Sequence, residues 1–368
     1  MAELMLVNLF GPVLGLVVLW LLPTMNRRTL PFGIRVPAAH VDAPVIAEQL
    51  RRYRRWILGA GVVVVVATVA LTYLLPIPVA QGIALFAVVA VWLPAFLRAR
   101  REISAVKERE GWYAGLRQGV AADTSLRTEP VRFPWLWAAP AVLLCVATAV
   151  LGILRYPDLP PTLVTHWDLD GAPDRTVPTT VVSAFTLVFV QVAMTALLVG
   201  LMWASIRFRP DLDAAAPAAS AHQHRGFIVA TAKAVLVLSA LVNVSMLVIA
   251  WRMWDGGGRL PAGVVLLPIL AGTAMVIGSA IRTGQGGSRL PADGEPGAGT
   301  AEEDTGVVQR DDDKYWTAAS IYVNRDDPAM FVPKRLGIGW TVNFGNPKGL
   351  ALFAAILLAP LVLTAVLR

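Results

Sequence analysis

The sequence alternates between long apolar stretches and shorter polar segments. Eight apolar runs are each about 20 residues long, the length that an α-helix needs to cross the hydrocarbon core of a bilayer. Open strands would leave backbone groups unpaired in lipid, so each run predicts a transmembrane helix. The runs are residues 4–22, 56–75, 82–97, 134–154, 181–204, 227–250, 263–281 and 350–367.

Composition points to the same fold class. Of the 368 residues, 56% are hydrophobic and 15% are charged, whereas about a quarter of the residues in a soluble domain are charged. The first run lacks a basic leader and an A-x-A cleavage site, so we expect it to be retained. The sequence therefore predicts an all-α polytopic membrane protein with about eight transmembrane helices and a small strand-containing cytoplasmic module.

The net charge of +7 is distributed unevenly among the polar segments. Seven arginines follow the first run, eight arginines and lysines follow the third, and three arginines follow the fifth. The segments after the second, fourth and sixth runs hold four arginines between them. This alternation is the positive-inside pattern of a bacterial plasma-membrane protein. It predicts cytoplasmic basic loops and two extracytoplasmic termini, and it explains the charge without nucleic acid.

The polar segments divide the chain into seven parts. Two helices are expected at the cytoplasmic surface, one with Ile46, Leu50, Tyr53 and Ile57 on one face, the other from residue 98 to about 118. The parts are residues 1–55 (first helix and basic loop), 56–133 (helical hairpin and basic segment), 134–204 (a transmembrane pair enclosing an extracytoplasmic loop, 155–180), 205–281 (a cytoplasmic loop and a second pair), 282–306 (a flexible linker), 307–348 (the cytoplasmic module) and 349–368 (the last helix).

The extracytoplasmic loop carries the densest polar chemistry in the sequence. Its prolines disfavour helix, and a cluster of polar and aromatic residues follows them. Three interpretations remain open: carboxylates that bind a hard cation, acid–base chemistry around the histidine, and an aspartate-capped turn that recognises an extracellular ligand. The sequence favours the third, with no metal, no cofactor and no catalytic residue. The candidate ligand-binding residues are His166, Trp167, Asp168, Asp170 and Asp174.

The same loop resembles a known domain. Residues 159–174, LPPTLVTHWDLDGAPD, are similar to a domain of unknown function with a P-x(4)-H-[FW]-[DN]-x-x-G-x-x-D core, found in bacterial multipass membrane proteins. Its best-known members are immunity and signalling proteins for the sporulation-delay toxin, so the resemblance implies sensing of, or immunity to, a secreted peptide. The FGIRVP stretch at residues 32–37 resembles segments upstream of that domain. The matching core positions are Pro161, His166, Trp167, Asp168, Gly171 and Asp174.

Residues 315–346 resemble a second uncharacterised bacterial module that accompanies the first. Apolar and polar residues alternate there between turn formers, which predicts short strands. The aspartates at 311–313 and at 326–327 are expected in solvated turns. The candidate residues for contact with a cytoplasmic protein are Trp316, Tyr322, Asn324, Lys334, Arg335 and Trp340.

Polar residues within apolar runs are the last candidates. Lys233 lies in the sixth run with Asn243, and Gln191 lies in the fifth. A buried, paired Lys233 would mark an ion or substrate path, whereas its long stem can also reach back to the interface.

The sequence therefore favours a non-enzymatic membrane protein for ligand sensing, signalling or immunity. Its expected partners are the bilayer, an extracellular peptide and a cytoplasmic protein. Two alternatives remain: a transporter that uses Lys233 in a polar cavity, and an envelope enzyme that uses His166 and the nearby aspartates.

Overall fold

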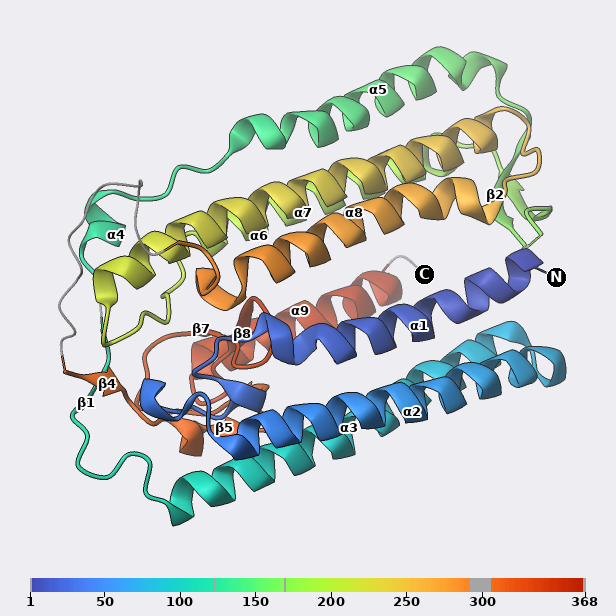
Figure 1. Cartoon of the computed structure of the whole chain (residues 1–368). Coiled ribbons are helices and arrows are strands. Elements are labelled where there is room, and N and C mark those ends of the chain that lie inside the picture. Colours follow the sequence, from blue (N-terminus) through green and yellow to red (C-terminus); the bar gives the residue numbers. More distant parts are fainter. Residues whose placement is uncertain (1, 122, 169, 292–305, 367–368) are drawn as a thin grey trace.

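The structure, a computed structural model, describes residues 2–121, 123–168, 170–291 and 306–366. Long helices lie side by side along one common direction (Figure 1). Within the described residues the helices are α1 (Ala2–Met25), α2 (Pro44–Leu74), α3 (Ile77–Arg109), the one-turn α4 (Ser125–Thr128), α5 (Ala139–Arg155), α6 (Val181–Ser205), α7 (Pro217–Trp254), α8 (Ala262–Thr283) and α9 (Pro347–Val366).

The strands of the described chain form four small two-stranded sheets. The pair nearest the middle of the chain, β2 (Thr162–Trp167) and β3 (Pro173–Pro178), is an antiparallel hairpin. The other pairs are β1 (Gln118–Gly119) with β4 (Val308–Gln309), which is parallel, and the antiparallel pairs β5 (Trp316–Thr317) with β6 (Ile321–Tyr322), and β7 (Phe331–Pro333) with β8 (Trp340–Val342).

Seven of the described helices are long and apolar enough to cross a membrane: α1, α2, α3, α5, α6, α7 and α8. They coincide with the first seven predicted runs, so the all-α polytopic fold class is confirmed. The eighth run forms α9, as far as it is described. The chain is a multi-pass membrane protein.

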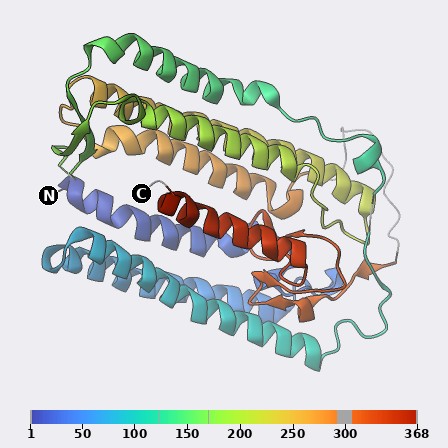
Figure 2. The ribbon, with the colours of Figure 1, turned by 180° about the vertical axis from the view of Figure 1, so that it is seen from behind.

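The two soluble parts of the chain lie at opposite ends of the bundle. The β2–β3 hairpin and the start of α1 lie at one end, and the strands β4 to β8 lie at the other (Figures 1 and 2). We call these the hairpin end and the module end, and residues 307–348 the C-terminal module. Helix α7 runs the length of the bundle between the two ends.

The helix expected before the second span is the first part of α2. Tyr53 and Ile57 are buried on its inner face, where the Tyr53 hydroxyl donates a hydrogen bond of 2.6 Å to the carbonyl of Leu19. Ile46 and Leu50 pack against the same cluster. The amphipathic pattern therefore predicted this helix and its face correctly.

The second surface helix is shorter than expected. Helix α3 continues past the membrane-spanning part but ends at Arg109, not near residue 118. Gly111 and Gly115 adopt φ of +60° and +72°, the left-handed conformation that ends helices. The linker predicted at 282–306 is described at residues 282–291 and at residue 306, and its part from 292 to 305 lies outside the described residues.

Candidate functional site

The β2–β3 hairpin is shaped by two irregularities in its register. Val164 pairs with Thr176, His166 with Arg175 and Trp167 with Pro173, so Thr165 and Asp174 are extra residues on their strands. Such bulges twist a strand and redirect its side chains. Here they bring His166 Nδ1 to 2.6 Å from Asp174 Oδ1 on the exposed face.

The other two candidate aspartates stand at the tip of the hairpin. Asp168 Oδ1 accepts a 2.7 Å bond from the amide of Ala172, which is the Asx cap that the sequence favours. The Asp170 backbone carbonyl accepts from Arg259, and its side chain is exposed. Among the described residues, no group of three or more histidine, cysteine, aspartate or glutamate side chains is placed to hold a metal ion.

The inner face of the hairpin packs on the connection between α7 and α8. Leu163 is fully buried in a cluster with Met253 and Trp254 at the end of α7. The Trp167 indole donates a 3.0 Å bond to the carbonyl of Gly258. Gly171 lies so close to the α7–α8 connection that an added Cβ would be 2.6 Å from the carbonyl oxygen of Leu260. Trp167 therefore anchors the hairpin, while His166, Asp168, Asp170 and Asp174 stay exposed.

Within the helices, Asn243 and Gln191 belong to one buried polar cluster. Asn243 Nδ2 donates to Thr195 Oγ1 at 2.9 Å and to the carbonyl of Ala141 at 3.1 Å. Gln191 Nε2 donates to the carbonyl of Asn243 at 3.0 Å. These bonds join α5, α6 and α7, and the lone cysteine, Cys145, packs beside them. The cluster is built like the interhelical polar contacts that hold transmembrane helices together.

Lys233 lies apart from this cluster. Its Nζ is 5.2 Å from the ring centroid of Trp137, which directly precedes α5 at the module end. The side chain is half-buried. This cation–π contact is the geometry of a lysine that reaches along its helix toward the interface.

At the module end, the segment after α1 is the centre of the packing. Phe32 and Gly33 have φ of +49° and +73°, and an added Cβ on Gly33 would be 2.3 Å from Ala319 Cβ. The carbonyl of Gly33 accepts from Arg100 at 3.0 Å and from Arg335 at 3.1 Å. The FGIRVP stretch therefore connects the C-terminal module to α3.

A network of buried ion pairs surrounds this segment. Arg35 Nη2 is 3.0 Å from Asp211, and Lys107 Nζ is 2.7 Å from both Asp311 and Asp313. Arg335, whose side chain is 2% exposed, pairs with Asp312 and Asp313. Four separate parts of the chain thus meet in one charge network: the segment after α1, the end of α3, the α6–α7 connection and the C-terminal module.

The network shifts the pKa values of its members. Burial alone would raise the pKa of Asp211, but Arg35 and Arg27 outweigh it and lower that pKa to about 2. Burial likewise opposes ionisation of Asp313, yet Arg335 and Lys107 lower its pKa. Burial lowers the pKa of Arg35, and the attraction of Asp211 and Asp312 more than reverses the effect. The carboxylates are therefore held in their charged form.

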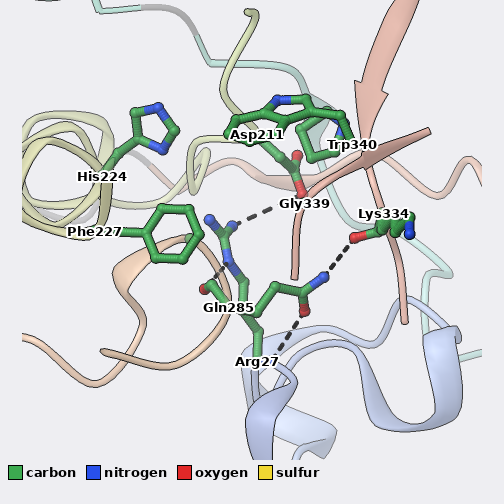
Figure 3. A pocket seen from close by; sticks show the side chains of 10 residues that line it. Arg27, Asp211, His224, Phe227, Gln285, Lys334, Gly339 and Trp340 are labelled. Atoms are coloured by element: carbon green, nitrogen blue, oxygen red, sulfur yellow. Dashed lines mark hydrogen bonds and ion pairs between the residues drawn. The ribbon is translucent and has the colours of Figure 1, made fainter. Parts of the chain in front are cut away.

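Figure 3 shows where the network meets α7. Arg27 points toward Asp211, 3.7 Å from it, and its backbone amide donates 3.2 Å to Gln285 Oε1. Gln285 in turn donates to the carbonyl of Lys334. His224 and Phe227 of α7 close the other side of a cavity of about 30 Å³, which has room for about one water molecule.

The six residues predicted in the C-terminal module divide into two groups. Trp316, Tyr322, Asn324 and Arg335 are buried, whereas Lys334 is exposed and Trp340 is half-buried. The module is organised by Asn343, which was not predicted. Its Nδ2 donates to the carbonyls of Asn324 and Asp327 at 2.8 and 3.0 Å, and its Oδ1 accepts from the amide of Gly345.

The solvated turn predicted for residues 311–313 is wrong. These aspartates are partly buried partners of Arg35, Lys107 and Arg335. Asp327 also pairs, accepting a 3.0 Å bond from the Tyr322 hydroxyl, and only Asp326 is exposed. In the sequence, the arginines and lysines of the basic loops were interpreted only as topology signals. Their ion pairs with aspartates far along the chain were therefore not predicted.

Two family models match parts of the chain. One, described as a domain of unknown function (DUF1648), matches residues 143–192, which include most of α5, the β2–β3 hairpin and the first half of α6. The other, described as a family of unknown function (DUF5808), matches residues 325–350, with β7, β8 and the start of α9. No curated protein and no solved structure matches the chain.

Proposed function

We propose that this protein is a membrane sensor whose hairpin end faces outward and binds a secreted ligand, and whose module end faces a cytoplasmic partner. The observation that carries the proposal is the position of α7. Trp254, at one end of this helix, packs in the hairpin cluster, and His224 and Phe227, near its other end, line the cavity beside the charge network.

The hairpin end has the features of a ligand-binding surface. The outer face of the hairpin presents His166, Asp168, Asp170 and Asp174 to solvent on a backbone fixed by Trp167 and Gly171. A rigid scaffold with exposed, varied polar groups suits recognition of a peptide. The resemblance of residues 159–174 to the toxin-immunity proteins supports a secreted peptide as the ligand class.

Orientation follows from charge. The module end carries the basic loops, and the positive-inside rule places such loops in the cytoplasm. Both termini and the hairpin are then extracytoplasmic. Lys233 beside Trp137 provides no support for a transport path.

The coupling of the two ends is tested by Gly171→Ala. The added Cβ meets the carbonyl of Leu260 and displaces the hairpin from the α7–α8 connection. Hydrogen exchange of the whole protein in nanodiscs should then increase in residues 307–346 at the far end. Gly256→Ala is the matched control, because Gly256 also has a positive φ of +81° but no atom near its added Cβ. Unchanged exchange at the module end in Gly171→Ala would overturn the proposal.

One observation favours the envelope enzyme as a second candidate. The 2.6 Å contact between His166 and Asp174 is a geometry that orients an imidazole for proton transfer. Hydrolysis of envelope substrates by the purified wild-type protein, lost in His166→Ala, would support this candidate over a receptor.

A further inference from the structure

A wide groove lies beside the module-end half of α6 and α7. Its volume is about 830 Å³, within the range of sites that enclose small organic ligands. One wall is the segment that leads into α5, another is the end of α6 with the residues after it, and α7 forms the third. Its principal lining residues are Phe133, Trp135, Trp203, Arg207, Phe208 and Arg209.

The groove adjoins an exposed apolar surface of α6. Trp135 and Trp203, which line it, are 60% and 45% exposed. Leu197 and Leu201 continue the exposed surface of α6 from there toward the middle of the helix. Tryptophans collect at the level where lipid headgroups meet the acyl chains, and exposed leucines collect below it. The groove therefore begins at headgroup level.

The arginines of the groove are complementary to a lipid headgroup, and its apolar residues are complementary to an acyl chain. Arg207 lies 3.8 Å from the ring centroid of Trp203 and donates a 3.1 Å bond from Nη1 to the Trp203 carbonyl, and Arg209 has a 3.5 Å ion pair with Asp327. Both arginine side chains are exposed beside the groove. Among the described lining residues the one carboxylate is Asp123, which caps the amide of Ser125 at 2.7 Å. The accessible apolar residues of the groove include Val120, Leu126 and Phe133, over the buried Leu212 and Ile228.

We propose that this groove binds one anionic phospholipid. Arg207 and Arg209 bind its phosphate, as guanidinium groups bind phosphate oxygens with paired hydrogen bonds. An acyl chain lies along Val120, Leu126 and Phe133. A soluble phosphate would leave this apolar floor unused, and a peptide would have to displace lipid from the exposed helix surface. Basic pockets between transmembrane helices bind anionic headgroups in this way.

The test uses the full chain in a neutral detergent, titrated with phosphatidylglycerol or phosphatidylcholine, and reads binding by native mass spectrometry. The wild type should retain phosphatidylglycerol in preference to phosphatidylcholine. Arg207→Gln and Arg209→Gln should each weaken phosphatidylglycerol binding about fivefold, and the double variant about 25-fold. Both side chains are exposed, and Asp327, which loses its ion pair in Arg209→Gln, keeps the bond from the Tyr322 hydroxyl; a thermal melt of each variant checks that it is folded. Arg132 is an exposed arginine in the segment that leads into α5 and does not line the groove, so Arg132→Gln should bind phosphatidylglycerol as the wild type does.

Two results would overturn the proposal. One is equal phosphatidylglycerol affinity in the double variant and the wild type. The other is thermal stabilisation of the wild type by inorganic phosphate alone that equals the stabilisation by phosphatidylglycerol, since the groove would then be a site for free anions.

Discussion

At the scale of single residues, the charges at the module end depend on one another. Arg335 and Lys107 are almost fully buried, and both contact Asp313. A buried charge is tolerated only while its partner is present, because the low dielectric strongly penalises an unpaired ion. The network therefore specifies how the C-terminal module docks, and each member can be tested alone.

Asp313→Asn removes one of the two carboxylate partners of each of two buried cations, Arg335 and Lys107. We expect a loss of about 3 kcal/mol in the free energy of unfolding, at the low end for a broken buried pair, because each cation stays buried but keeps its other carboxylate. Thermal melting in detergent measures the loss. Asp326→Asn, an exposed aspartate in the same module, should change stability by less than about 0.5 kcal/mol. Equal melting temperatures for the two variants would contradict the buried network.

Asp211 gives the network a predictable response to acid. Its pKa in the folded protein is about 2, below the usual 3.8, so the unfolded chain binds the proton more tightly. The stability from its ion pairs is complete above about pH 4 and is lost as the pH falls toward 2. Melting temperatures measured across this interval should decline in the wild type. The decline should be shallower in Asp211→Asn, which has no carboxylate to protonate; identical pH profiles would refute the assignment.

At the scale of elements, the helices could be predicted and the contacts between distant segments could not. Length and apolar composition were enough for the transmembrane helices, because a bilayer leaves few alternatives to a continuous helix. The amphipathic face of α2 was also readable, through Tyr53 and Ile57. The end of α3 was missed because Gly111 and Gly115 override a polar pattern that still looks helical.

The site was predictable only in part for the same reason. The hairpin residues could be grouped from the sequence because they are close together in it, where a motif is visible; their role in binding stays a prediction. The pairing of Arg35 with Asp211, and of Lys107 with Asp313, joins residues 176 and 206 positions apart. Such pairs form only through tertiary packing, so the spacing of residues in the sequence does not predict them.

Helix α7 carries two polar residues with different roles. Asn243→Ala removes the bonds to Thr195 and Ala141 that link three helices. Interhelical hydrogen bonds in membranes contribute modestly, so we expect a loss of about 1–2 kcal/mol, measured by unfolding in mixed micelles. A neutral result would mean that apolar packing alone holds these helices.

Lys233→Met distinguishes the sensor from a transporter. Lys233 contacts Trp137, which lies just before α5. Methionine should keep the packing of the lysine stem and change the free energy of unfolding by less than about 0.5 kcal/mol. Ligand-dependent changes at the module end should persist as well. Loss of solute flux into proteoliposomes in this variant, without loss of folded protein, would instead identify a transport path.

At the scale of the whole molecule, the helical bundle has two different ends. The hairpin with its exposed His166 and Asp174 occupies one end of the helical bundle, and the C-terminal module with its charge network occupies the other (Figure 1). Because α7 contacts both, a change at one end has a continuous packed path to the other. A sensor needs the two ends to lie on opposite sides of the membrane.

Cysteine accessibility in intact cells measures this division directly. Thr162 and Ser320 are exposed at the hairpin end and in the module, and Cys145 is buried, so Thr162→Cys and Ser320→Cys report on single positions. A membrane-impermeant maleimide added outside should label the Thr162→Cys variant in intact cells. It should label the Ser320→Cys variant only after the cells are permeabilised. Labelling of both variants in intact cells, or of neither, would contradict a receptor that spans the membrane between its two soluble parts.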